Sequence, residues 1–148
     1  MELYNLMKNI YGKNNEEQLI EAISTVKGKL NHLTEERMCK VYSSYLLNEL
    51  NLRHVPVRKI NTLEFGLTYE HEFILVPAND NGYFLADLTF SQFKQNSENL
   101  TQLQNCGYQL MDNQSLHSYL SIISQNHFNQ SISVDDMFYH QNSHKARK

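Results

Sequence analysis

The chain has 148 residues, 41% of them apolar and 20% charged, with a net charge of −3. This length fits one domain that can bury its own core, and the composition excludes disordered and fibrous classes. No apolar run is long enough to cross a bilayer, and the acidic N-terminus lacks the apolar region of a signal peptide. We therefore expect no membrane span, and a location in the cytoplasm or export as an effector without a cleavable signal peptide. We expect a single domain over residues 1–140 and a flexible tail over 141–148.

Charge and cysteine content exclude two further classes. The basic residues are scattered except for a short C-terminal tail, Lys145–Lys148, so an organised surface for nucleic acid is not expected. Cys39 and Cys106 can form at most one disulfide, and they make neither a disulfide framework nor a CxxC metal site. We expect no metal and no cofactor, and the oligomeric state is left open.

Two amphipathic helices are predicted in the first third of the chain. The first covers 14–30, with Glu16 and Glu17 in its first turn, where the helix dipole favours carboxylates. Thr34 is a good N-cap for a second helix that runs to about Asn51, which would place Cys39 more than one turn inside it. The two apolar stripes are Leu19, Ile20, Ile23, Val26 and Leu30, and then Met38, Val41, Tyr42, Tyr45, Leu46 and Leu50.

The middle of the chain predicts an antiparallel sheet. Strands are expected over 55–60, 68–77 and 83–88, with Pro56 marking an edge or a strand start. Residues 78–82 combine Asn, Asp and Gly, which tolerate positive φ in turns. The last two strands are therefore predicted to form a β-hairpin.

The hairpin register decides whether His71 and Asp87 meet. A three-residue loop would pair His71 directly with Asp87, at a Cβ separation of about 4.5–5.5 Å. A five-residue loop shifts the pairing by two and keeps both side chains on one face of the sheet. A loop of two or four residues would place them on opposite faces. The sequence leaves these alternatives open.

The last third of the chain is predicted to be mainly helical. Ser97 can cap a helix that carries Leu100, Leu103 and Cys106 and ends at Gly107, and Cys106 is expected to pack against its neighbours. Residues 108–111 form a short extended piece, and 134–139 a short helix. Asp112 can cap a helix whose core face is Leu116, Tyr119, Leu120 and Ile123. The predicted class is α+β, with the helix that carries Cys39 packed on a small antiparallel sheet and further helices flanking it.

Three residues of this framework indicate chemistry. Asp87 falls in an apolar strand, where a carboxylate is disfavoured unless it has a partner, and a same-face His71 would supply one. Such a pair raises the basicity of the imidazole, and an imidazolium near Cys39 would favour the reactive thiolate. Taken alone, Cys39 is more often a small buried hydrophobe, and His71 and Asp87 are more often structural. Together they suit a nucleophile, a base and an orienting carboxylate better than a metal site, because no fourth ligand accompanies them.

The order of these motifs resembles a known superfamily. A cysteine on a helix, then His-x-Phe-Ile-Leu-Val on a strand, then Tyr-Phe-Leu-Ala-Asp-Leu-Thr-Phe on the next, is similar to the core of the transglutaminase-like and papain-like cysteine enzymes. The resemblance covers residues 35–93. It implies that Cys39 is the nucleophile, His71 the general base and acid, and Asp87 the orienter. It also implies a fold of that type, as in compact bacterial proteases and deamidases.

The function expected from the sequence is therefore a cysteine-dependent amide hydrolase. It would act on a protein or peptide through a thioester, either as a protease or as a protein-glutamine deamidase. The Cys39 backbone N–H is one oxyanion donor, and the sequence names no second one. Acyl transfer on the same three residues, and a non-catalytic protein-binding domain, are the alternatives.

Overall fold

The computed structural model describes residues 2–33, 38–78, 82–93, 98–124 and 132–140, with side chains from Asn15 onward. Within these ranges the α+β class predicted from the sequence is confirmed. The helices are α1 (Glu2–Lys29), α2 (Cys39–Leu52), α3 (Thr101–Cys106), α4 (Asn113–Ser124) and α5 (Val134–Tyr139). The strands are β1 (Arg58–Asn61), β2 (Glu72–Pro77), β3 (Tyr83–Ala86) and β4 (Tyr108–Met111), and short 3₁₀ turns cover Thr62–Phe65 (η1), Phe90–Phe93 (η2) and Glu98–Leu100 (η3).

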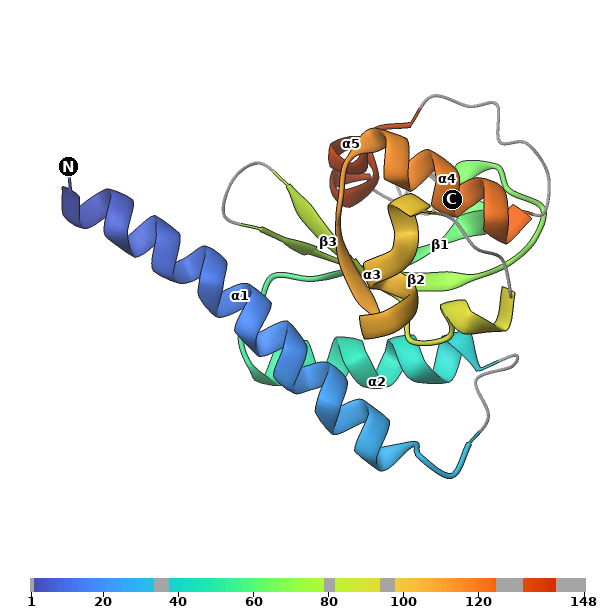
Figure 1. The fold of residues 1–148 in the computed structure, drawn as a ribbon, viewed down its shortest axis with the longest axis horizontal. Coiled ribbons are helices and arrows are strands. Elements are labelled where there is room, and N and C mark those ends of the chain that lie inside the picture. The colour runs from blue at the N-terminus through green and yellow to red at the C-terminus, as the bar shows by residue number, and fades with distance from the viewer. Residues whose placement is uncertain (1, 34–37, 79–81, 94–97, 125–131, 141–148) are drawn as a thin grey trace, which may run out of the picture.

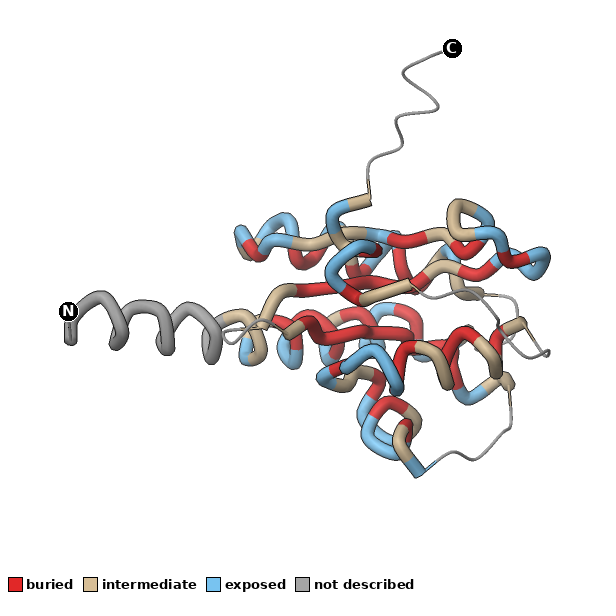
Figure 2. Tube along the Cα trace, turned by 90° about the horizontal axis from the view of Figure 1, so that it is seen from above, coloured by how far each residue is buried: buried red, intermediate tan, exposed pale blue. Residues whose placement is uncertain are grey.

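The sheet forms the middle of three layers. Its strands run in the order β1-β2-β3-β4, and every neighbouring pair is antiparallel. Helices α1 and α2 lie on one face and α3, α4 and α5 on the other (Figure 1). Alternation along β2 supplies both cores, because Phe73 and Leu75 point to one face and Ile74 and Val76 to the other. Figure 2 shows the buried residues concentrated along this central layer.

The loop of the β2–β3 hairpin has five residues, which is one of the two odd lengths that the sequence left open. Pro77 pairs with Tyr83, which leaves residues 78–82 between the strands, and Ile74 pairs with Ala86 at the other end. Residues 79–81 of this loop lie outside the described residues. Because the loop is odd, His71 and Asp87 project from the same face, offset diagonally rather than directly opposed.

The start predicted for the second helix is wrong, and the difference bears on Cys39. Helix α2 begins at Cys39, after Met38 in a non-helical conformation with φ −107 and ψ 14. Met38 supplies only its carbonyl, which accepts the Tyr42 N–H at 2.9 Å. Thr34, the predicted cap, lies outside the described residues. Cys39 is therefore the first helical residue of α2 instead of lying more than a turn inside it.

All three predicted strands are shorter in the structure, because their ends make other hydrogen bonds. The strand predicted over 83–88 ends at Ala86, and the Asp87 N–H donates to the Gly107 carbonyl. Val55 is excluded from β1, since its N–H donates to the Leu50 carbonyl at 3.0 Å and closes the end of α2. Before β2, the Thr62 hydroxyl donates to the Tyr69 carbonyl at 2.6 Å and accepts the His71 N–H at 2.8 Å. The chain therefore folds back on η1 over residues 68–71 instead of extending as a strand.

The first helix is longer than predicted, and each apolar stripe has one exposed member. Helix α1 starts at Glu2 instead of residue 14, and the chain has no proline before Pro56 to prevent this. Ile20 and Tyr45 were placed on core faces but are 45% and 44% exposed. The rest of the α1 stripe is buried.

The helices and the extended piece predicted between residues 98 and 140 are confirmed, although Leu100 belongs to the 3₁₀ turn η3 before α3. The Ser97 cap and the tail predicted over 141–148 lie outside the described residues. The extended piece 108–111 is β4, which adds a fourth strand beside β3. Gly107 ends α3 with φ 85, and its carbonyl accepts the Asp87 N–H at 2.9 Å. A φ in this left-handed region strains other residues, and a Cβ there would also lie 2.6 Å from a Leu88 methyl carbon, so glycine is favoured where α3 meets the end of β3.

Candidate active site

The three predicted site residues come from three elements that meet at one end of the hairpin. Strands β2 and β3 stop pairing at Ile74 and Ala86, and the chain turns away after Asp87. Helix α2 crosses this end of the sheet, and its first residue, Cys39, borders a small space that Glu72 and Asp87 also line. His71 precedes β2 and Asp87 follows β3 by one residue each, so backbone topology alone brings the three together.

His71 and Asp87 form a buried pair. His71 Nε2 lies 2.7 Å from Asp87 Oδ2, and the two side chains are 1% and 2% exposed. The Phe93 ring packs edge-on against the imidazole at a centroid distance of 5.1 Å. The ring is therefore fixed between a carboxylate and an aromatic wall, which restricts its orientation and excludes water.

Asp87 accepts hydrogen bonds on both carboxylate oxygens. Oδ1 accepts the Thr89 N–H at 3.0 Å and the Thr89 hydroxyl at 2.9 Å. Oδ2 accepts the Tyr119 hydroxyl at 2.6 Å in addition to His71. Burial alone would raise the pKa of this carboxyl, but the His71 charge and these donors lower it below its usual range. Asp87 is therefore an ionised group at neutral pH.

The charge of Asp87 determines the state of His71. Burial disfavours the imidazolium, but the charge and hydrogen bond of Asp87, together with a hydrogen bond that the ring donates to Cys39, raise the pKa of His71 to about 10. The imidazole is thus protonated at neutral pH. Since Nε2 is bonded to Asp87, Nδ1 is the nitrogen left for the thiol.

Cys39 is half-buried, and its surroundings favour the thiolate. Burial raises the pKa of the thiol, but a hydrogen bond with the His71 side chain, the Glu72 backbone N–H and the charge of His71 together lower it below its ordinary value. The first position of a helix adds to this, because the unpaired N–H groups there favour negative charge. The arrangement therefore favours an ion pair between a Cys39 thiolate and the His71 imidazolium.

The Glu72 backbone N–H is a feature that sequence reasoning missed. Thr62 bonds His71 on the β1 side, so strand alternation turns the next N–H, that of Glu72, toward the β3 side, where pairing has ended. The Glu72 carboxylate is held by the Ser43 hydroxyl at 3.2 Å and the Asn61 amide at 3.3 Å. A second N–H is therefore fixed beside the Cys39 sulfur.

Three further residues take no part in this group. Gln18, which lies upstream of Cys39, accepts a hydrogen bond from Arg53 at 3.2 Å on the α1 side. Tyr42 is a core residue whose hydroxyl donates to the Leu30 carbonyl at 3.4 Å. Cys106, expected to pack, is exposed. Across the described ranges no three His, Cys, Asp or Glu side chains are grouped to hold a metal ion.

Tyr119 and Thr89 were also missed as polar partners of the site. Tyr119 falls on the predicted core face of its helix, where its spacing does not distinguish it from Leu116. One signal was available: a buried tyrosine hydroxyl needs an acceptor, and Asp87 is a buried carboxylate in need of donors.

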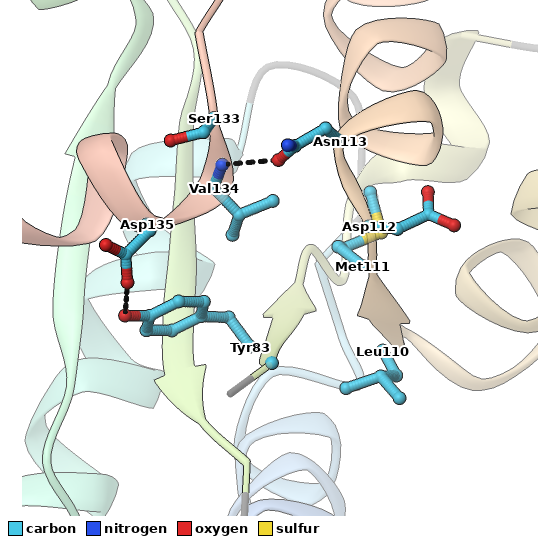
Figure 3. A pocket seen from close by; sticks show the side chains of 9 residues that line it. Tyr83, Leu110, Met111, Asp112, Asn113, Ser133, Val134 and Asp135 are labelled. Atoms are coloured by element: carbon cyan, nitrogen blue, oxygen red, sulfur yellow. Dashed lines mark hydrogen bonds between the residues drawn. The ribbon is translucent and has the colours of Figure 1, made fainter. Parts of the chain in front are cut away.

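Two cavities differ in their relation to these residues. A space of about 10 Å³, enough for roughly one water, lies beneath Cys39 and is bordered by Glu72, Asp87 and Leu88. A larger pocket of about 450 Å³ lies at the opposite end of β3, beside Tyr83 (Figure 3).

The larger pocket is explained by helix capping. Asp112 and Ser133 accept N–H groups at the starts of α4 and α5, the Asn113 amide oxygen accepts the Val134 N–H at 3.0 Å, and Asp135 accepts the Tyr83 hydroxyl. Its polar lining thus serves the fold, and the three predicted site residues lie near the other end of the strand.

No helix within the described ranges is long and apolar enough to span a bilayer. Comparison with protein-family models, with curated proteins and with solved structures gives no significant match.

Proposed function

We propose that this protein is a cysteine-dependent amide hydrolase that uses Cys39, His71 and Asp87. The observation that carries the proposal is the buried His71–Asp87 pair at 2.7 Å, with the Cys39 thiol as the next hydrogen-bond partner of the imidazole. A purely structural cysteine has no need of an ionised neighbour, and buried charges without a role are disfavoured in a core. The order of these residues along the chain supports the proposed kinship with transglutaminase-like and papain-like cysteine enzymes.

The first half of the reaction follows from the protonation states. The Cys39 thiolate attacks the carbonyl carbon of an amide, and a C–S bond forms. The developing oxyanion is stabilised by the backbone N–H groups of Cys39 and Glu72, which border the same sulfur. His71, already protonated, gives its Nδ1 proton to the amine as the C–N bond breaks, which leaves a thioester on Cys39.

The second half restores the site. Water attacks the thioester carbon while His71 accepts its proton, the C–S bond breaks, and a carboxylic acid leaves. Asp87 stays ionised throughout and stabilises the imidazolium each time it forms. A peptide bond as substrate makes the protein a protease, and a glutamine side chain makes it a deamidase. A nucleophile other than water would make it an acyltransferase.

Alkylation with iodoacetamide tests the proposal, because the chain offers its own control. Cys106 is exposed and Cys39 only half-buried, so access alone favours Cys106. We expect Cys39 to be alkylated faster at neutral pH, and His71→Ala to remove that preference. Alkylation of Cys106 first, or a Cys39 rate that is indifferent to His71→Ala, contradicts the proposal and favours a non-catalytic domain.

Product analysis separates the reactions. Wild-type protein and Cys39→Ser are incubated with a complex peptide mixture and the products examined by mass spectrometry. New peptide termini that depend on Cys39 indicate a protease, and conversion of glutamine to glutamate indicates a deamidase.

A further inference from the structure

Tyr119 occupies an unusual position for a core tyrosine. It lies in the middle of α4, is fully buried, and packs edge-on against Phe73 at a centroid distance of 5.1 Å. Its hydroxyl reaches across from the helical layer to Asp87 Oδ2 at 2.6 Å, the same oxygen that lies 2.7 Å from His71 Nε2. Phenylalanine would fill the same space, so packing alone does not account for the hydroxyl.

The hydrogen bond that Tyr119 donates to Asp87 Oδ2 affects the charge of Asp87 in one direction only. The Tyr119 hydroxyl can only donate to a carboxylate, and it therefore stabilises the ionised form of Asp87. An ionised Asp87 in turn stabilises the His71 imidazolium, and through it the Cys39 thiolate. Tyr119 is fully buried and its hydroxyl bonds Asp87, so its main effect on Cys39 is expected to pass through Asp87 and His71.

We infer that Tyr119 is a positioning residue of this site, which keeps Asp87 ionised and aimed at His71 so that Cys39 rests as a thiolate. The inference rests on the proposed function and extends it by one residue. The pKa of Tyr119 is raised well above its ordinary value, first by burial and then by the Asp87 charge, so the hydroxyl keeps its proton and remains a donor.

The other charged groups near the site keep their partners when the Tyr119 hydroxyl is removed. The charged and titratable neighbours are Lys40 and Glu70, which pair at 3.1 Å, Lys59 and Glu72, which pair at 3.7 Å, and Tyr69 beside Phe93. None of them bonds the Tyr119 hydroxyl among the contacts described, so removing that hydroxyl leaves their pairs in place.

The test is the pH dependence of iodoacetamide alkylation at Cys39 in Tyr119→Phe, with Tyr83→Phe as the matched control. Tyr83 is also buried and donates to a carboxylate, Asp135, at 2.5 Å, but at the far end of β3. We expect the low-pH limb of the Cys39 profile to move upward by about half to one pH unit in Tyr119→Phe. The Tyr83→Phe profile should coincide with that of the wild type.

A profile of Tyr119→Phe that superimposes on the wild type, or an equal shift in Tyr83→Phe, overturns the inference. If Tyr119→Phe does not fold, Thr89→Val decides instead: it removes the hydroxyl that donates to Asp87 Oδ1 at 2.9 Å, and the same upward shift is expected. The two proposals fail separately. If Cys39 is not alkylated preferentially in the wild type, the proposed function is wrong. If that preference is present but Tyr119→Phe does not shift the pH profile, only the role of Tyr119 is wrong.

Discussion

The two ends of β3 carry the same polar contact in different surroundings. At one end the Tyr119 hydroxyl donates to Asp87 at 2.6 Å, and at the other the Tyr83 hydroxyl donates to Asp135 at 2.5 Å. Asp87 is 5% exposed, whereas Asp135 is an exposed residue in the first turn of α5. Asp135 has water and a helix N-terminus to stabilise its charge, and Asp87 has only other side chains and one backbone N–H.

This difference indicates what turns a carboxylate into part of a site. A buried carboxylate is coupled to its partners, so its charge is transmitted to His71 and then to Cys39. An exposed carboxylate is screened, and its bond to a tyrosine affects little beyond that bond. The larger pocket lies at the screened end, so cavity size does not coincide with the buried, coupled carboxylate.

The largest difference between the two ends of β3 is expected when each carboxylate is neutralised in turn. Asp87→Asn leaves His71 without its charge partner, and we expect alkylation of Cys39 to slow about tenfold or more and the free energy of unfolding to fall by about 3 kcal/mol. Asp135→Asn should leave the alkylation rate unchanged and alter stability by less than about 1 kcal/mol. Alkylation kinetics and urea denaturation measure the two effects. Equal effects at the two ends would show that burial does not distinguish them.

A smaller effect concerns pH and stability at the buried end. The pKa of His71 is raised from 6.5 to about 10, so its contribution to stability is complete below pH 6.5 and is lost as the pH rises through about 10. The lowered pKa of Cys39 has the opposite sign, because a native thiolate adds stability as the pH rises toward the pKa of the unfolded thiol. Cys39→Ser removes that second contribution.

The measurement is therefore made in the Cys39→Ser background. Urea denaturation between pH 6.5 and 10 should show stability falling more steeply with His71 present than after a further His71→Gln substitution. Parallel curves would mean that His71 is neutral in the folded protein, which contradicts the ion pair.

The smallest effect is expected at the pocket end. The Ser133 hydroxyl accepts the Asp136 N–H at 3.0 Å and caps α5, so Ser133→Ala should lower the free energy of unfolding by about 1 kcal/mol. Alkylation of Cys39 should not change. A change in the Cys39 rate would mean that the two ends of the sheet are coupled, which contradicts the view that the pocket end does not affect Cys39.

The sequence predicted the parts of the site that depend on strand alternation. The apolar surroundings of Asp87 predicted that it needs a partner, and a loop with an odd number of residues, one of the alternatives left open, would place His71 on the same face. The five-residue loop of the structure is one of these odd loops. The length of the loop could not be deduced, because Ala78 and Gly82 are compatible with both odd alternatives, and the carbonyl of Gly82 accepts the Ala78 N–H in the loop that forms.

Three features depended on tertiary contacts that local patterns do not encode. Helix α2 begins at Cys39, later than the capping preference of Thr34 predicts. The Glu72 N–H is free for the sulfur only because β3 ends at Ala86. Tyr119 belongs to an apolar stripe, and its partner lies 32 residues away in the sequence, so no spacing rule connects them.

In the proposed site, Cys39 rests as a thiolate because of His71. The most direct measurement is titration of the thiolate ultraviolet absorbance in Cys106→Ser, which leaves Cys39 as the single thiol. We predict ionisation below the ordinary pKa of a cysteine, and a return to or above that value when His71→Ala is added. Ionisation at or above the ordinary value that is unchanged by His71→Ala would contradict the account.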